Sequence, residues 1–247
     1  MNKAIILAAG RGSRMRPFTD KLPKCRTKFF GKELIEWQLK ALRENGFDQE
    51  SIGLIRGYLK ETFDFNLQYF ENPIWANSNM VRTLTFASEW AKESNTVISY
   101  ADIVYSSRDI QNLIENSKSD INILYDPNWE KLWRMRFNNP LDDAETFIHD
   151  GKKLISIGEK AGNISEIQGQ YMGLLYFTPT GWSIFNDFVG SKSDKEINNT
   201  DCTTLLRSLI SSGVDIGIVP AIDKWYEFDS ESDLNIYLEK FSATEIF

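Results

Sequence analysis

The sequence predicts an α/β fold, a doubly wound and mostly parallel sheet with a small mixed β lobe. Two observations predict it. Short apolar runs alternate along the first half of the chain with segments whose apolar residues recur at helical spacing, the order that right-handed crossovers between parallel strands require. The second half is more mixed and contains a hairpin pattern. Because no repeat or low-complexity linker interrupts the chain, we expect residues 1–247 to form a single domain.

The first half supplies most of the expected sheet. Residues 3–9 form a continuous apolar run, which is typical of a strand buried on both faces. Residues 34–45 carry leucine and isoleucine at helical spacing, and Gly46 supplies a stop signal. The same patterns give strands at 51–58, 96–104 and 121–125 and helices at 77–93 and 108–116.

The hairpin lies in the second half. Residues 146–149 and 153–158 flank Asp150-Gly151, a dipeptide that favours a tight turn between two strands. We place this hairpin in the small lobe, on the substrate side of the molecule. The remaining patterns predict strands at 170–178 and 215–219 and helices at 200–212 and 232–241.

Composition argues against several classes of function. The net charge of −7 repels nucleic acid and anionic membranes. His149 is the only histidine, and Cys25 and Cys202 are the only cysteines, which argues against a Ser-His-Asp triad, a zinc site and a disulfide framework. The apolar run at residues 4–9 is too short for a signal peptide or a membrane span. We therefore expect a soluble cytoplasmic protein without a nucleic-acid or membrane partner.

Positive charge is concentrated at the N-terminal end. Residues 1–32 hold nine basic side chains and one acidic side chain, whereas the other 215 residues hold 19 basic and 34 acidic ones. A basic segment on an acidic body indicates a site for a compact polyanion such as a triphosphate. A solvated basic face is the alternative.

A glycine-rich turn in this segment favours the phosphate site. Gly10 and Gly12 directly follow the first strand, where the chain must turn and its amides can approach a ligand. Met15 stands where a dinucleotide fingerprint has its third glycine, and Gly31-Lys32 is followed by glutamate, so neither that fingerprint nor a P-loop is present.

The wider motif carries a family resemblance. Leu-Ala-Ala-Gly-Arg-Gly-Ser-Arg-Met-Arg-Pro at residues 7–17, followed by Pro23-Lys24, resembles the nucleotidyltransferases that join a nucleoside triphosphate to a sugar phosphate or phosphocholine. The resemblance implies a Rossmann-like core. It also implies that Arg14 and Lys24 neutralise phosphate charge during catalysis. The residues it implies in nucleotide binding are Leu7, Ala8, Ala9, Gly10, Gly12, Ser13, Asn79 and Ala101.

The same family implies a metal site. Asp102 stands where these enzymes have a magnesium-binding aspartate, although Ala101 replaces the usual preceding glycine. Asp229 ends a Trp-Tyr-Glu-Phe-Asp segment that resembles the family's second metal-binding motif. Two carboxylates with phosphate oxygens suit Mg²⁺. The alternative for Asp229 is a helix N-cap, because a predicted helix follows it.

Candidates for the acceptor site are less specific. Asn77 and Asn79 resemble a segment that the choline-phosphate branch uses in its active site, or they cap a helix. Trp129, Trp133 and Tyr171 could form an aromatic box for a quaternary ammonium group, or belong to the core. Against that box, Arg134 and Arg136 would suit an acceptor with a second anion. Glu159, Glu166 and Gln168 are further acceptor-site candidates, with surface carboxylates as the alternative. The acceptor residues we select are Asn77, Trp133, Arg136, Glu166 and Tyr171.

A narrower resemblance covers residues 70–180. Segments 99–105, 131–133, 136–146 and 170–174 resemble cytidylyltransferases that act on phosphoglutamine in capsular phosphoramidate pathways, beside those that use phosphocholine or 2-aminoethylphosphonate. This resemblance implies CTP as donor and a small phosphorylated or phosphonate acceptor, in preference to a sugar 1-phosphate. With Mg²⁺ as the cofactor that the wider family implies, the mechanism we expect is direct displacement, in which a phosphate or phosphonate oxygen attacks the α-phosphorus and pyrophosphate leaves. Two alternatives stay open: a sugar-1-phosphate nucleotidyltransferase that uses another nucleotide, and a non-catalytic nucleotide-binding subunit. A homodimer is also left open.

Overall fold

A computed structural model describes residues 2–245. Its centre is a seven-stranded sheet in the order β12-β8-β11-β6-β1-β4-β5. Six strands run in one direction, and β11 is antiparallel to both of its neighbours. The strands are β1 (Lys3–Ala8), β4 (Ile52–Arg56), β5 (Gln68–Glu71), β6 (Thr96–Tyr100), β8 (Ile121–Asp126), β11 (Gln170–Phe177) and β12 (Ile216–Pro220).

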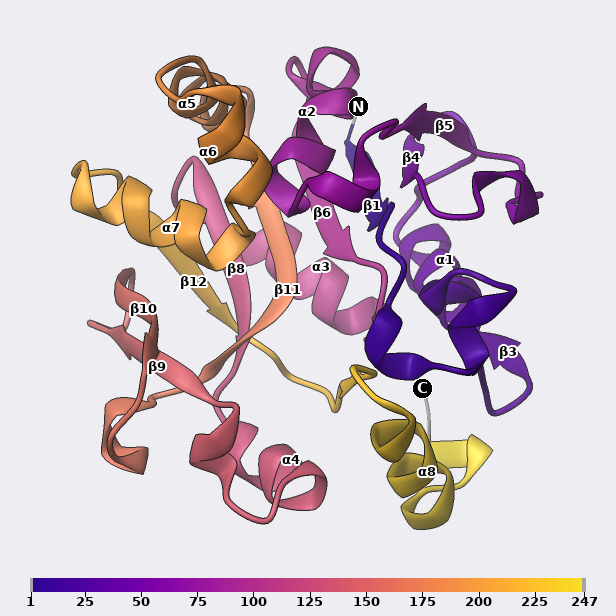
Figure 1. The fold of residues 1–247 in the computed structure, drawn as a ribbon. Coiled ribbons are helices and arrows are strands. Elements are labelled where there is room, and N and C mark those ends of the chain that lie inside the picture. The colour runs from indigo at the N-terminus through magenta and orange to yellow at the C-terminus, as the bar shows by residue number, and fades with distance from the viewer. Residues whose placement is uncertain (1, 246–247) are drawn as a thin grey trace.

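Helices cover both faces of the sheet (Figure 1). On one face α1 (Leu34–Glu44) packs against α3 (Ser107–Asn116). On the other, α2 (Met80–Ala91) packs against α5 (Pro179–Gly190), α6 (Asp194–Asn199) and α7 (Cys202–Ser211). The prediction of a doubly wound, mostly parallel α/β fold is confirmed. In the part of the chain that the structure describes, no helix combines the length and the apolar character needed to cross a bilayer.

The expected hairpin is present. Strands β9 (Glu145–His149) and β10 (Leu154–Lys160) pair antiparallel, and Gly151 takes a positive φ of 91° in the turn between them. The hairpin packs on α7, and α4 (Trp129–Arg136) lies beside it in Figure 1. We did not predict α4, α5, α6 or β5.

Two short strand pairs shape the other end of the molecule. Strands β2 (Lys28–Phe29) and β3 (Lys32–Glu33) form one, and β7 (Ile103–Val104) and β13 (Tyr226–Glu227) form the other. The expected strand at 96–104 is therefore two strands in two sheets, separated by a turn that contains Asp102. The last α-helix among the described residues, α8 (Glu231–Lys240), follows β13.

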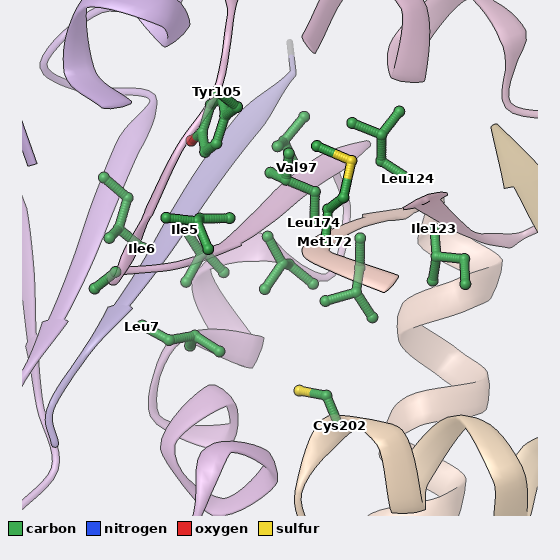
Figure 2. Packing of buried hydrophobic residues seen from close by; sticks show 14 of the residues in the cluster. Ile5, Ile6, Leu7, Val97, Tyr105, Ile123, Leu124, Met172, Leu174 and Cys202 are labelled. Atoms are coloured by element: carbon green, nitrogen blue, oxygen red, sulfur yellow. The ribbon is translucent and has the colours of Figure 1, made fainter. Parts of the chain in front are cut away.

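Apolar side chains from both halves of the chain meet in one core. Ile5, Ile6 and Leu7 of β1 share this core with side chains from β6, β11 and, further along the sheet, β8, and Cys202 of α7 lies at one side of it (Figure 2). These side chains are almost completely buried. Burial of each isoleucine, leucine, valine or methionine side chain in this core stabilises the fold by about 1.5–3 kcal/mol.

Candidate active site

A pocket of about 290 Å³ lies where β1 and β6 end. The carboxyl ends of parallel strands form this edge, the usual place for a ligand in an open α/β sheet. The pocket combines distant parts of the chain: the glycine-rich turn with Lys24 and Cys25, the start of α2, the turn after β6 and the segment before α8. Its lining is Leu7, Ala8, Gly10, Gly12, Ser13, Arg14, Lys24, Cys25, Met80, Tyr100, Ala101, Asp102 and Asp229.

The glycine-rich turn packs closely against Lys24, and both line the pocket. Gly12 has a φ of +66°, and a Cβ at this position would lie 2.6 Å from the Cβ of Lys24. Only glycine fits this close approach and this left-handed conformation without strain. A Cβ at Gly10 would instead meet nothing within 4 Å, so the pocket has free space beside this residue.

Lys24 joins the two aspartates. Its Nζ lies 2.7 Å from Oδ2 of Asp102 and 3.1 Å from Oδ1 of Asp229. Arg14 adds a contact of 2.8 Å between its Nη2 and the same Asp229 oxygen. Burial alone would lower the pKa of Lys24, but the two carboxylates outweigh burial and raise that pKa. The lysine is therefore held in its charged form.

Backbone pairing sets the distance between the two aspartates. Ile103 of β7 pairs with Glu227 of β13, and the amide of Phe228 donates a 3.0 Å hydrogen bond to the carbonyl of Asp102. Asp102 and Asp229 therefore leave the same small sheet side by side. Figure 1 shows the indigo segment after β1 next to the yellow chain that enters α8.

The alternative role of Asp229 as a helix N-cap is wrong. Ser230 is the N-cap of α8, and its hydroxyl accepts a hydrogen bond from the backbone amide of Asp233. The Asp229 carboxylate is left for the cations around it. Burial would raise the pKa of Asp229, but Lys24, Arg14 and Arg136 outweigh burial and lower it.

Arg136 requires a correction. We expected it to contact the acceptor, but its side chain has no exposed surface. Its Nε lies 2.9 Å from Asp233, its Nη1 contacts Glu227, and its Nη2 lies 3.4 Å from Asp229. The three carboxylates hold the guanidinium in place, so Arg136 forms a buried ion pair that fixes the position of Asp229. Burial also raises the pKa of Glu227, although Arg136 opposes that shift.

The three aromatic residues do not form one box. Trp129 and Trp133 are buried and lie 5.9 Å apart, and their indole nitrogens donate to the Ile167 carbonyl and to Asp143. The ring of Tyr171 packs edge-on against Tyr100, at 5.7 Å. The two tryptophans are core residues, as the alternative had it.

Other expected residues lie outside the pocket. Asn77 and Asn79 line a separate polar cleft of about 470 Å³, and Oδ1 of Asn79 accepts the amide of Met80 where α2 begins. Ala9 is buried, and its carbonyl accepts the amide of Tyr58. Glu166 is exposed in the lobe, and its carboxylate accepts a hydrogen bond from the amide of Gly162.

A larger cavity of about 1020 Å³ lies between α4 and residues 221–226, and none of the five acceptor residues that we selected lines it.

Three residues of the lining, Tyr100, Met80 and Cys25, were not predicted from the sequence. Tyr100 and Met80 lie next to predicted site residues, so adjacency to Ala101 and Asn79 was the available signal. Cys25 follows Lys24 directly, but burial raises the pKa of its thiol to about 12, so the thiol stays protonated.

Comparison with known proteins adds a family. Residues 4–139 match the family model described as the MobA-like NTP transferase domain. The CTP:phosphoglutamine cytidylyltransferase of Campylobacter jejuni subsp. jejuni is 35% identical over 254 residues, which cover 96% of this chain and 99% of that protein. The choline-phosphate cytidylyltransferase of Streptococcus pneumoniae is 51% identical over 63 residues, which cover 26% of this chain and 27% of that protein.

The fold also matches a solved structure. The inositol-1-phosphate CTP transferase from T. maritima superposes with a TM-score of 0.75 at 17% identity, and the match covers 96% of this chain and 94% of that one. At this identity the match supports the fold alone.

Proposed function

This chain belongs to the MobA-like NTP transferase family, and from that premise we propose that it is a CTP-dependent cytidylyltransferase. It transfers CMP from CTP to a small phosphorylated acceptor and releases pyrophosphate. The observation that carries the proposal is the meeting of Lys24 and Arg14 with Asp102 and Asp229 beside the glycine-rich turn. Paired acids and paired cations at one strand edge suit a reaction in which negative charge moves between phosphate oxygens.

The identities of donor and acceptor rest on the relatives. A relative that aligns along almost its whole length and acts on CTP and phosphoglutamine makes these the first substrates to test. Phosphocholine follows, because a shorter but more similar segment aligns with an enzyme that uses it. 2-Aminoethylphosphonate, a smaller phosphonate that also carries a cationic amine, is the third, because an enzyme that uses it is 34% identical over 113 residues.

The chemistry needs no general base. An oxygen of the acceptor phosphate, which is an anion at neutral pH, forms a bond to the α-phosphorus of CTP. The bond from that phosphorus to the bridging oxygen breaks, and its electron pair leaves with pyrophosphate. Lys24 and Arg14 stabilise the charge that grows on the leaving group, while the turn amides at Gly10 and Gly12 orient the phosphates. This accounts for an enzyme with a single histidine, which lies in the β-hairpin.

The acids fit a divalent cation. Asp102 and Asp229 offer hard oxygen ligands within reach of one cation, since both contact the same ammonium group. Among residues 2–245 no group of three or more acidic, histidine or cysteine side chains could hold a metal. Two carboxylates completed by phosphate oxygens and waters are what Mg²⁺ commonly takes. When bound, Mg²⁺ would neutralise the phosphates and polarise the α-phosphorus, and Asp102 and Asp229 would hold it.

The remaining expectations stay predictions. We treat residues 1–247 as one domain that works in the cytoplasm, without nucleic acid or membrane, as a monomer or a homodimer.

A substrate matrix tests the function. Purified protein with Mg²⁺ is given CTP, UTP, GTP, ATP or dTTP, together with phosphoglutamine, phosphocholine, 2-aminoethylphosphonate or a sugar 1-phosphate. Pyrophosphate release is measured and the conjugate is identified by mass spectrometry. We expect the CMP conjugate of one of the first three acceptors. A sugar nucleotide would establish the sugar-1-phosphate alternative, and nucleotide binding without any conjugate would support a non-catalytic subunit.

A further inference from the structure

Gln38 is a buried residue that takes no part in the chemistry described so far. It lies in the middle of α1 and has no exposed surface. Its Nε2 donates two hydrogen bonds, one of 3.0 Å to the carbonyl of Tyr100 and one of 2.6 Å to the carbonyl of Ile103. These two carbonyls lie on either side of Ala101 and Asp102. One side chain therefore spans the turn that presents the aspartate to the pocket.

The carboxamide of Gln38 is only half paired. Its Oε1 has no hydrogen-bond partner within residues 2–245, and an unpaired buried oxygen costs stability. The two acceptors are both carbonyls, so the orientation of the carboxamide is fixed by its donors. In return for this cost, the Nε2 of Gln38 makes two hydrogen bonds to the turn between β6 and β7, which lies outside the regular pairing of the central sheet.

The helix that carries Gln38 is itself well anchored. A capping box begins α1, and Trp37 donates from its indole nitrogen to the carbonyl of Phe29. Near the other end, Asn45 donates to the carbonyl of Ser107, where α3 begins. The helix thus holds the segment from Tyr100 to Ser107 at two points. The amide of Phe228 also holds this turn, by its hydrogen bond to the carbonyl of Asp102.

We propose that Gln38 is a positioning residue that aims the Asp102 carboxylate at the cation shared with Asp229. The inference rests on the proposed function, because the cation in question is the one that accompanies the nucleotide. A turn without this clamp would keep its sequence and its carboxylate but lose the fixed distance to Lys24 and Asp229. Partners in the outer shell of a metal site tune metal affinity in this way.

Two variants of Gln38 and one control test the proposal. Q38M keeps the side-chain volume but has no donor, and Q38N keeps a carboxamide that is too short to reach both carbonyls. The control is N122A, since Asn122 is equally buried and clamps the turn at Lys118 and Ser119 instead. For each protein, calorimetry without acceptor measures the Mg²⁺ concentration that half-saturates CTP binding. Amide hydrogen exchange at Phe228 reports the turn itself, and a thermal melt reports stability.

The expected pattern separates positioning from folding. In Q38M and Q38N the half-saturating Mg²⁺ concentration rises by about tenfold, and the Phe228 amide exchanges faster. N122A melts at a lower temperature but keeps the Mg²⁺ dependence of the parent protein. If Q38M does not fold, Q38N carries the comparison.

Two failures are distinguishable. Parent protein that binds CTP equally well with and without Mg²⁺ would overturn the metal role in the proposed function. Parent protein with normal Mg²⁺ dependence, together with Gln38 variants that match it, would overturn this inference alone.

Discussion

Lys24 and Asp102 form an ion pair of 2.7 Å although 78 residues separate them in sequence. The same ammonium also contacts Asp229, so one lysine holds together the two carboxylates that would bind a cation. A CTP–Mg²⁺ complex would bring both a replacement cation for the aspartates and a phosphate partner for the lysine. We therefore expect nucleotide and metal to bind together more tightly than either binds alone.

The charge of Asp102 is the first quantity to test. D102N keeps the shape of the side chain but removes the anion that would hold the metal. Pyrophosphate release should fall on the order of 100-fold, because metal-assisted charge stabilisation contributes several kcal/mol to the barrier. The melting temperature should change little, since the side chain is partly exposed at the pocket. Turnover close to that of the parent protein would remove Asp102 from the mechanism.

Lys24 should matter for the departure of pyrophosphate. K24Q keeps a hydrogen-bond donor but loses the charge, and we expect a loss of about 100-fold or more in the rate of pyrophosphate release. K28Q is the matched control, because Lys28 is an exposed lysine of the same basic segment and does not line the pocket. Equal losses in both variants would mean that the general positive charge, and not the position of Lys24, is what counts.

Gly12 should be required for two separable reasons. G12A suffers the cost of a left-handed alanine and also pushes its Cβ onto Lys24. G31A shares the first cost, with a φ of +82°, but meets no atom within 4 Å. G31A should lose about 1–2 kcal/mol in the free energy of unfolding, and G12A should lose more, because its Cβ must also displace Lys24. Only G12A should also bind CTP more weakly, by about tenfold, in a calorimetric titration. Equal CTP affinity in the two variants would contradict the contact with Lys24.

Local patterns predicted the elements that depend on local rules. The apolar run of β1, the helical spacing of α1 and the Asp150-Gly151 turn all follow from propensity and periodicity within one segment. The glycine-rich turn and both aspartates came from motif resemblance, and the structure brings them together.

The features that we missed depend on distant partners. The run 96–104 is mostly apolar, and its second part, β7, leaves the central sheet to pair with β13, which lies more than 120 residues later. Arg136 is basic and lies near a predicted site, so sequence favoured a substrate contact. Its three acidic partners are Glu227, Asp229 and Asp233, which lie about 90 residues later, and nothing in the sequence around Arg136 indicates these ion pairs.

The pH dependence of the free energy of unfolding should report the raised pKa of the buried carboxyl of Asp109. This residue lies in the first turn of α3, is fully buried, and accepts hydrogen bonds from Ser106 and from the amide of Ile222. Burial raises the pKa of the Asp109 carboxyl above its ordinary value, with Asp223 nearby adding to the shift, and the hydrogen bonds only partly oppose it. The native state therefore binds this proton more tightly than the unfolded chain does.

The sign of the effect follows from that difference. The stability contributed by the protonated form of Asp109 is fully present below the unfolded pKa and is lost as the pH rises through the raised folded pKa. D109N keeps the acceptor for Ile222 and has no charge to bury, so it should lose none of this stability. Urea unfolding of both proteins from about pH 4 to about pH 7 measures the difference. D109N should gain stability relative to the parent protein as the pH rises, and the gain should level off above the folded pKa. A difference that is constant over this range would mean that Asp109 titrates normally, and that the turn at Ile222 solvates its charge despite the burial.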